Sequence, residues 1–212
     1  MFPHGLQARA RLIAESLVGP LARRGITPNV ITLAGFVFNV VTAGVIAKGY
    51  LTIGGCLLFL AGLFDMLDGA LARVTTRQTT FGAFLDSLLD RYSEAAILLA
   101  LIFQFTENQD TLAVILGYVV AVGSILISYA RARAESLGLD GKVGIAPRPE
   151  RVLILGVGLL FQERGTVVAL LVLALLTHTT AMQRLYSVWR QTNNQTEDGP
   201  PKPRGAAETS AS

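Results

Sequence analysis

The stretch from Asp65 to Asp90, "DMLDGALARVTTRQTTFGAFLDSLLD", holds four aspartates inside a sequence that is otherwise strongly apolar. The chain has 212 residues, of which 51% are hydrophobic and only 16% are charged. Its mean hydropathy is +0.50. This composition is too apolar for an ordinary soluble domain of this size. Because a carboxylate in hydrocarbon is costly, four of them in one stretch point to a function.

Six apolar segments occupy most of the chain around this stretch. A membrane-spanning helix needs about 20 mostly apolar residues, and only the fifth segment is short for that. The segments lie at about 29–48, 52–72, 82–105, 111–136, 149–162 and 166–189. The sequence therefore predicts an all-α integral membrane protein with six transmembrane helices across residues 29–189.

The two ends of the chain differ from this apolar region. Residues 4–22 carry an apolar stripe at spacings of three and four, with arginines beside it. This pattern predicts an amphipathic helix lying along the membrane surface, with a short soluble cap as the alternative. Residues 191–212 are polar and rich in Pro, Gly and Ser, which predicts a disordered cytoplasmic tail. Residues 1–190 would then form one membrane domain.

The basic residues of the connections gather on one side of the predicted bundle. The opposite side holds only Lys48 and Arg164. The positive-inside rule therefore places both termini and the aspartate-bearing helix ends in the cytoplasm. We expect a multi-pass protein of the plasma membrane with a cytoplasmic active site. The net charge of +3 is modest, and no nucleic-acid partner is expected.

The spacing of the four aspartates places them in two pairs. Asp65 and Asp68 are three residues apart, and Asp86 and Asp90 are four apart, so each pair shares a helix face. Both pairs lie at the cytoplasmic ends of successive antiparallel helices, which we expect to be adjacent. Four carboxylates in one pocket need cations, and Mg²⁺ suits oxygen ligands where phosphates are substrates. Two ions are the recurrent arrangement for displacement at phosphorus.

An ion or small-solute transporter is an alternative from a different functional class, since acids inside a membrane also mark transport pathways. It predicts acids near the bilayer midplane, beside helices broken by Gly or Pro. Here the acids lie at helix ends, next to small residues and to Arg73. Small residues let a nucleotide approach the backbone, and arginine binds phosphate oxygens. The pattern favours phosphate chemistry.

The pattern D-x2-D-G-x2-A-R-x8-G-x3-D-x3-D, which runs from Asp65 to Asp90, resembles the full signature of the CDP-alcohol phosphotransferase (CDP-alcohol phosphatidyltransferase) family. The resemblance implies six transmembrane helices after a juxtamembrane helix, and a homodimer. It also implies a reaction in which an alcohol hydroxyl attacks the lipid phosphate of a CDP-linked lipid and CMP leaves. The ligands of two Mg²⁺ or Mn²⁺ ions would be Asp65, Asp68, Asp86 and Asp90, with Asp90 as the catalytic base. The implied contacts of the CDP part are Thr27, Asn29, Gly69, Ala72, Arg73 and Gly82.

A second motif, "SYARARAESLGLDGKVGIAPRPER", covers residues 128–151 and is rich in arginine. Positive-inside bias alone can place arginines there, but several of them beside an acidic pocket suggest a site for a phosphorylated acceptor. The motif is similar to a branch of the same family that acts on inositol 1-phosphate, although that branch often has lysine at the position of Arg131. The implied acceptor-binding residues are Ser128, Arg131, Arg133, Arg148, Arg151 and Arg184.

The sequence thus predicts a membrane enzyme of phospholipid synthesis. It would transfer the phosphatidyl group of a CDP-diacylglycerol-type lipid to inositol 1-phosphate. Transfer to glycerol 3-phosphate, or from an ether-lipid donor, remains open at this point. His178 lies alone in an apolar segment, and we expect it to be a hydrogen-bonded packing residue.

Overall fold

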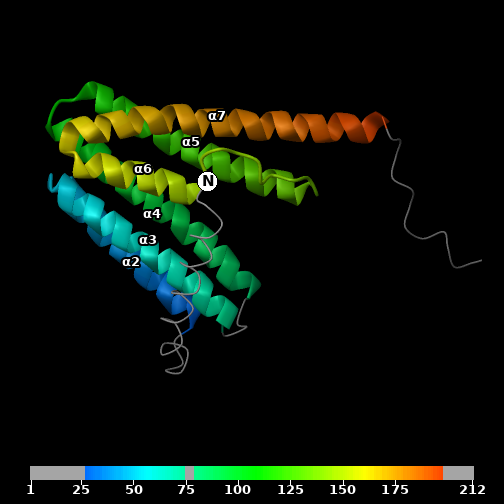
Figure 1. Cartoon of the computed structure of the whole chain (residues 1–212), viewed down its shortest axis with the longest axis horizontal. Coiled ribbons are helices and arrows are strands. Elements are labelled where there is room, and N and C mark those ends of the chain that lie inside the picture. The colour runs from blue at the N-terminus through cyan, green and yellow to red at the C-terminus, as the bar shows by residue number, and fades with distance from the viewer. Residues whose placement is uncertain (1–26, 75–78, 198–212) are drawn as a thin grey trace, which may run out of the picture.

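The structure is a computed structural model that describes residues 27–74 and 79–197. In this part of the chain all the regular structure is α-helical (Figure 1). The helices are α2 (Pro28–Ala47), α3 (Leu51–Val74), α4 (Thr80–Glu107), α5 (Thr111–Ser136), α6 (Arg148–Leu160) and α7 (Gln162–Glu197). They follow the six apolar segments in order, which confirms the all-α class. The interfacial helix predicted at residues 4–22 lies outside the described residues.

Three of the described helices contain a stretch long and apolar enough to cross a membrane: Pro28–Ala47, Thr111–Ser136 and Gln162–Asn193. A shorter apolar stretch, Leu51–Gly62, opens α3. Helix α6 has 13 residues and is therefore about 20 Å long, less than the hydrocarbon thickness of about 30 Å. Six complete membrane crossings stay a prediction.

The helices pack as a closed ring. Helix α2 packs against α3 and α4, α4 against α5, α5 against α7, α7 against α6, and α6 against α3. Apart from a minor contact of α3 with α7, each helix has two neighbours in the described chain. Helices α4 and α6 therefore face each other across the ring, and their described backbones do not touch.

Among the described residues α3 and α4 make no contact with each other, and α2 packs against both. The predicted approach of their acid-bearing ends stays a prediction, because the side chains of Asp65 and Asp68 lie outside the described part. A short connection constrains only the helix ends that it joins. Helix α2 fits between its two partners because its buried face carries small residues, including Gly35 and Ala43. A Cβ added to Gly35 would lie 3.1 Å from the Cβ of Phe64 on α3.

Small residues also bring α6 close to α3. A Cβ added to Gly55 would lie 2.9 Å from the carbonyl oxygen of Gly156, and one added to Gly156 would lie 2.8 Å from the ring of Phe59. Small residues permit this close packing of apolar helices. The main core, which includes Ile46, Leu101 and Leu170, fills the half of the bundle away from the start of α4.

Helix α7 is longer than the sequence predicts. It continues to Glu197, so the expectation of a disordered tail is wrong for residues 191–197. The physical reason is a contact distant in sequence. The side chain of Gln191 accepts a hydrogen bond from the amide of Asp140 at 2.9 Å and donates one to its carbonyl at 3.0 Å. The remaining predicted tail, 198–212, lies outside the described residues.

Candidate active site

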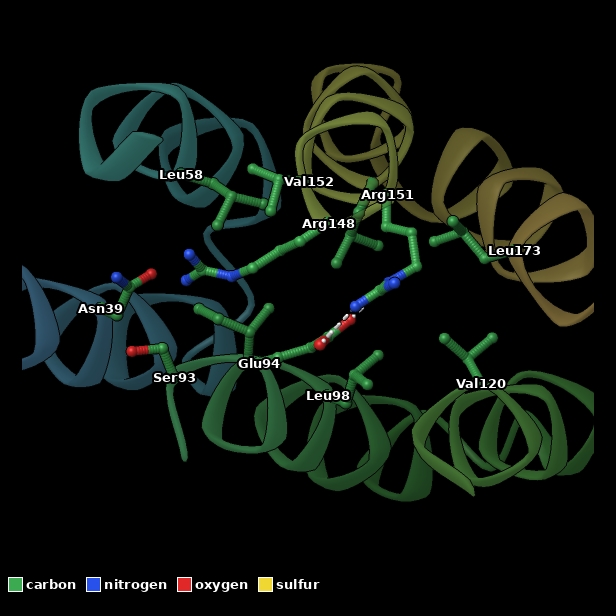
Figure 2. Close-up of a pocket in the computed structure, with 12 residues that line it drawn as sticks. Asn39, Leu58, Ser93, Glu94, Leu98, Val120, Arg148, Arg151, Val152 and Leu173 are labelled. Carbon is green, nitrogen blue, oxygen red and sulfur yellow. Dashed lines mark hydrogen bonds and ion pairs between the residues drawn. The ribbon is translucent and has the colours of Figure 1, made fainter. Parts of the chain in front are cut away.

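A small cavity lies at the centre of the helix ring, and every helix contributes to its wall (Figure 2). The contributing side chains include Asn39, Leu58, Glu94, Val120, Arg151 and Leu173. The space inside amounts to ≈ 30 Å³, enough for one or two water molecules. The polar groups of its wall come mainly from α4 and α6, which are the two helices that face each other across the ring.

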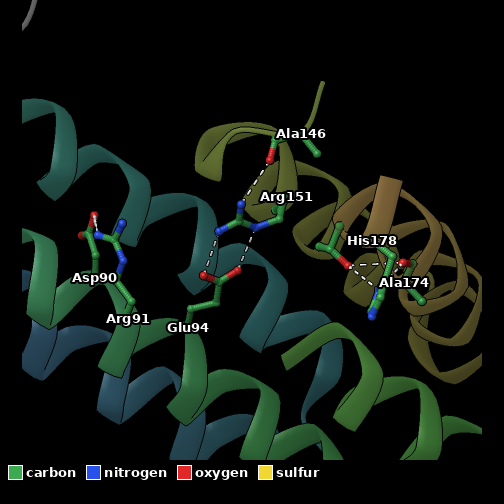
Figure 3. A network of polar contacts seen from close by, with 8 residues as sticks. Asp90, Arg91, Glu94, Ala146, Arg151, Ala174 and His178 are labelled. Atoms are coloured by element: carbon green, nitrogen blue, oxygen red, sulfur yellow. Dashed lines mark hydrogen bonds and ion pairs between the residues drawn. The ribbon is translucent and has the colours of Figure 1, made fainter. Parts of the chain in front are cut away.

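Two ion pairs bridge α4 and α6, and three of their four side chains, Glu94, Arg148 and Arg151, line this cavity. Asp90 Oδ1 lies 2.6 Å from Arg148 Nη1, and their side chains are 18% and 22% exposed. One helical turn further along, Glu94 accepts hydrogen bonds from Arg151 Nε and Nη2, both at 2.9 Å. Figure 3 shows this second pair as a two-pronged contact, with a third hydrogen bond from Arg151 to the carbonyl of Ala146 at 3.1 Å.

The predicted metal ligands lie on α3 and α4. Asp86 and Asp90 are half-buried, one turn apart on the same face of α4. Asp65 and Asp68 lie on α3, but their side chains are outside the described part of the structure. Among the described side chains there is no group of three His, Cys, Asp or Glu residues that could hold a metal ion. Asp86 and Asp90 are hard oxygen donors that suit Mg²⁺, and the four-carboxylate site stays a prediction.

The beginnings of α2 and α4 come together, and with them two residues predicted to bind the CDP part. Thr79 caps α4 by accepting a hydrogen bond from the amide of Gly82 at 2.9 Å. A Cβ added to Gly82 would lie 2.9 Å from Asn29 Oδ1, so only glycine lets Asn29 approach this closely. Thr27 is exposed at the N-cap of α2. The side-chain positions of Ala72 and Arg73, and the surroundings of Gly69, fall outside the description.

The six predicted acceptor-binding residues do not form one cluster. Arg148 and Arg151 line the central cavity. Arg184 is 6% exposed. It donates from Nε to the carbonyl of Val143 at 2.9 Å and from Nη1 to the carbonyl of Ile127. Arg184 thus holds the loop after α5 against α7. It also lies close enough to Arg131 and Arg151 for their charges to act on it.

The other three members are at the end of α5, nearer the surface. Arg131 is exposed and pairs with Glu135 at 2.9 Å. Arg133 is exposed as well, and Ser128 is half-buried. The structure therefore separates buried arginines held by protein groups from exposed arginines at a helix end.

Glu94 is a candidate functional residue that the sequence reading missed. The signal was present, because Glu94 follows Asp90 by four residues and therefore continues the same helix face. His178, in contrast, behaves as predicted. Its Nδ1 lies 3.0 Å from the carbonyl oxygen of Ala174, one turn earlier on α7, and 3.4 Å from Thr177 Oγ1.

A ring of apolar helices that gathers carboxylates and guanidinium groups near one end is suited to phosphate chemistry on a lipid at the membrane surface. The family comparison agrees with this class. Residues 25–189 match the family model described as CDP-alcohol phosphatidyltransferase. The chain belongs to this family of transferases and is therefore an integral membrane enzyme.

Relatives and solved structures are similar over most of the chain. An archaetidylinositol phosphate synthase from Methanothermobacter thermautotrophicus is 38% identical, over 85% of this chain and 93% of the relative. A phosphatidylinositol phosphate synthase from Mycobacterium marinum is also 38% identical, over 84% of this chain and 80% of the relative.

The crystal structure of the Mycobacterium tuberculosis phosphatidylinositol phosphate synthase with CDP-DAG bound has a TM-score of 0.79 and 36% identity, covering 84% of this chain and 94% of that one. A second structure of the same protein, in complex with manganese and citrate, has a TM-score of 0.78 and 35% identity, covering 83% of this chain and 88% of that one.

Proposed function

We propose that this enzyme transfers the phosphatidyl group of CDP-diacylglycerol to inositol 1-phosphate, forming phosphatidylinositol phosphate and releasing CMP. The observation that carries the proposal is the contact of Arg148 with Asp90 at 2.6 Å. It joins a cation suited to an acceptor phosphate to the carboxylate expected to act as base. The names of the relatives supply the same acceptor and, in one solved structure, the same donor.

The donor would be held by the starts of α2 and α4 and by α3. Asn29 and Gly82 are close together there, and Arg73 would contact a phosphate oxygen. Asp65, Asp68, Asp86 and Asp90 would hold two divalent cations, Mg²⁺ or Mn²⁺, and one similar structure contains manganese. Such ions, when bound, neutralise the carboxylates and the charge that develops on the leaving CMP.

The chemical step needs a base and a fixed acceptor. Asp90 would take the proton of the acceptor hydroxyl while that oxygen bonds to the lipid phosphorus and the bond from phosphorus to the CMP oxygen breaks. Arg148 would bind the acceptor phosphate through paired N–H groups. Since the two side chains are in contact, the acceptor would bind beside its base, which is where positioning contributes most to the rate.

The remaining basic residues would divide into two roles. Arg131, Arg133 and Ser128 lie near the surface at the end of α5 and would meet the acceptor as it enters. Arg151 and Arg184 are 5% and 6% exposed and already donate to protein oxygens. We infer that these two act mainly by fixing the position of α6 and of the loop before it.

The proposal includes the arrangement in the membrane. Six crossings would place both termini and the site on the cytoplasmic side of the plasma membrane, as the loop arginines favour. A homodimer is part of the same proposal. The topology is tested with single cysteines that are labelled from each side of sealed vesicles. They are placed in the Asn108–Thr111 connection or in the Asp140–Ala146 connection. Labelling of both connections from the same side would contradict it.

The activity is tested with purified enzyme in detergent, Mg²⁺ and CDP-diacylglycerol, by CMP release with four acceptors. We expect release with inositol 1-phosphate and little with glycerol 3-phosphate, free inositol or serine. Preference for glycerol 3-phosphate would overturn the acceptor, and no release with any acceptor would overturn the transferase reaction. A parallel series with a CDP-linked ether lipid tests the donor, because one relative is an archaetidylinositol phosphate synthase.

A further inference from the structure

The Glu94–Arg151 ion pair crosses the middle of the helix ring. It links α4 and α6, whose described backbones do not contact each other. Figure 2 shows the two side chains reaching toward one another from opposite walls of the cavity. Both carboxylate oxygens of Glu94 are engaged by Arg151. The pair therefore acts as a strut that sets the separation of the two helices.

Arg151 also holds the chain that leads into α6. Its Nη1 donates to the carbonyl of Ala146 at 3.1 Å, and Ala146 is fully buried. Ala146 comes two residues before Arg148, and Arg151 comes three residues after it. The backbone of Arg148 is thus fixed on both sides by one guanidinium group, which is itself fixed to α4 by Glu94.

The pair has little capacity left to bind the acceptor directly. Both carboxylate oxygens of Glu94 and all three guanidinium nitrogens of Arg151 are already engaged within the protein. Arg151 is 5% exposed and Glu94 is 18% exposed. Any influence of Glu94 on the reaction must therefore pass through Arg151 to a residue that does reach substrate, and Arg148 is one turn away on the same helix.

We propose that Glu94 is a positioning residue for the acceptor. Through Arg151 it holds the start of α6 at the distance where Arg148 meets Asp90, and so places the acceptor phosphate relative to the base. This inference rests on the proposed function. The strut needs charge on both partners, because a buried guanidinium without its carboxylate is strongly disfavoured and reorients.

The test compares Glu94→Gln and Glu94→Asp with a matched control, Glu107→Gln, at the exposed far end of α4. In Glu94→Gln we expect the KM for inositol 1-phosphate to rise about 10- to 100-fold, as for other residues that orient a site. The KM for CDP-diacylglycerol should stay within about twofold, since the donor contacts lie elsewhere. Glu94→Asp keeps the charge and should show a smaller rise, and the control none.

A second measurement does not depend on turnover. Inositol 1-phosphate should raise the Tm of the wild type and of Glu107→Gln, and this rise should be lost or halved in Glu94→Gln. In a protein that already carries Arg151→Lys, the additional change Glu94→Gln should raise the acceptor KM little further, because the two side chains act as one unit. If Glu94→Gln does not fold, the acceptor KM of Glu94→Asp and of Arg151→Lys decides the question.

Equal changes in both KM values, or a lower Tm with unchanged KM values, would overturn the inference and leave Glu94 with a purely structural role. So would full acceptor affinity in Glu94→Asp and Arg151→Lys. An inactive wild type with every acceptor would instead overturn the proposed function. The two failures are therefore distinguishable.

Discussion

The donor half of the site, on α2 to α4, and the acceptor half, on α5 to α7, hold their charged groups differently. On the acceptor half, Arg151 makes three hydrogen bonds to protein oxygens and Arg184 makes two. On the donor half, Asp90 pairs with Arg148 of the other half at 2.6 Å and, at 3.9 Å, with Arg91 beside it on α4. Arg151 and Arg184 are thus oriented by several protein oxygens each, two of them on Glu94 of α4, whereas Asp90 is paired with cationic side chains.

The largest effect on activity is expected from a change at Asp90, where the two halves are in contact. Asp90→Asn keeps the shape of the side chain but removes both the base and the charge that holds Arg148. We expect kcat to fall about 10²- to 10⁴-fold, the usual contribution of a general base. Single-turnover CMP release measures this. Asp110→Asn makes the same chemical change at the cap of α5, where asparagine caps equally well, and near-normal activity is expected. Full activity of Asp90→Asn would exclude it as the base.

Arg148→Ala tests whether the contact between the halves binds the acceptor. We expect the KM for inositol 1-phosphate to rise about 10- to 100-fold, since a charge-assisted pair is worth about 1.5–3 kcal/mol. The KM for CDP-diacylglycerol should change much less. Steady-state kinetics with each substrate varied in turn makes the measurement. Equal effects on both substrates would place Arg148 with the donor acids instead.

Gly82→Ala affects the donor half alone. The new methyl group would lie 2.9 Å from Asn29 Oδ1 and from Thr79 Oγ1, so the Asn29 side chain must move and the cap of α4 weakens. A lost cap costs about 1 kcal/mol of stability. The displaced Asn29 should separately raise the KM for CDP-diacylglycerol about fivefold, which corresponds to about 1 kcal/mol of lost binding. The acceptor KM should stay the same. The opposite pattern would contradict the assignment of Asn29 and Gly82 to the donor.

The smallest effect is expected at Arg131, whose ion pair with Glu135 is exposed on both sides at 47% and 44%. Such pairs contribute about 0–1 kcal/mol to stability. Arg131→Ala should therefore leave Tm within about 2 °C and raise the acceptor KM only about threefold, more so at low salt. Thermal unfolding and kinetics at two ionic strengths check this. Glu135→Ala should have the same Tm as Arg131→Ala, and its acceptor KM should be unchanged.

Much of the fold could be predicted from the sequence, because long apolar segments bounded by turns define helices one at a time. All six described helices begin within a few residues of the predicted positions. The order of packing could not be predicted. That α2 lies between α3 and α4 depends on the fit of its small face against both partners, including Gly35 against Phe64, and spacing along the chain does not reveal this.

For the site, the sequence motif predicted which residues carry charge but not how each is held. Arg151 and Arg184 look alike in sequence to Arg131 and Arg133, yet the first two are buried and the others exposed. The difference comes from contacts distant in sequence, such as the 57 residues that separate Glu94 from Arg151. The position of Glu94, four residues after Asp90, could have marked it as a candidate, but its pairing with Arg151 could not be predicted from the local pattern.

Helix α7 is longer than a bilayer requires. Its 36 residues extend about 54 Å, against a hydrocarbon thickness of about 30 Å, and Figure 1 shows it reaching beyond the other helices. Gln191 ties its outer part to Asp140. A helical fusion partner joined in register near this outer part would be carried at a fixed angle, which makes α7 a rigid handle for an imaging fiducial on this small membrane protein.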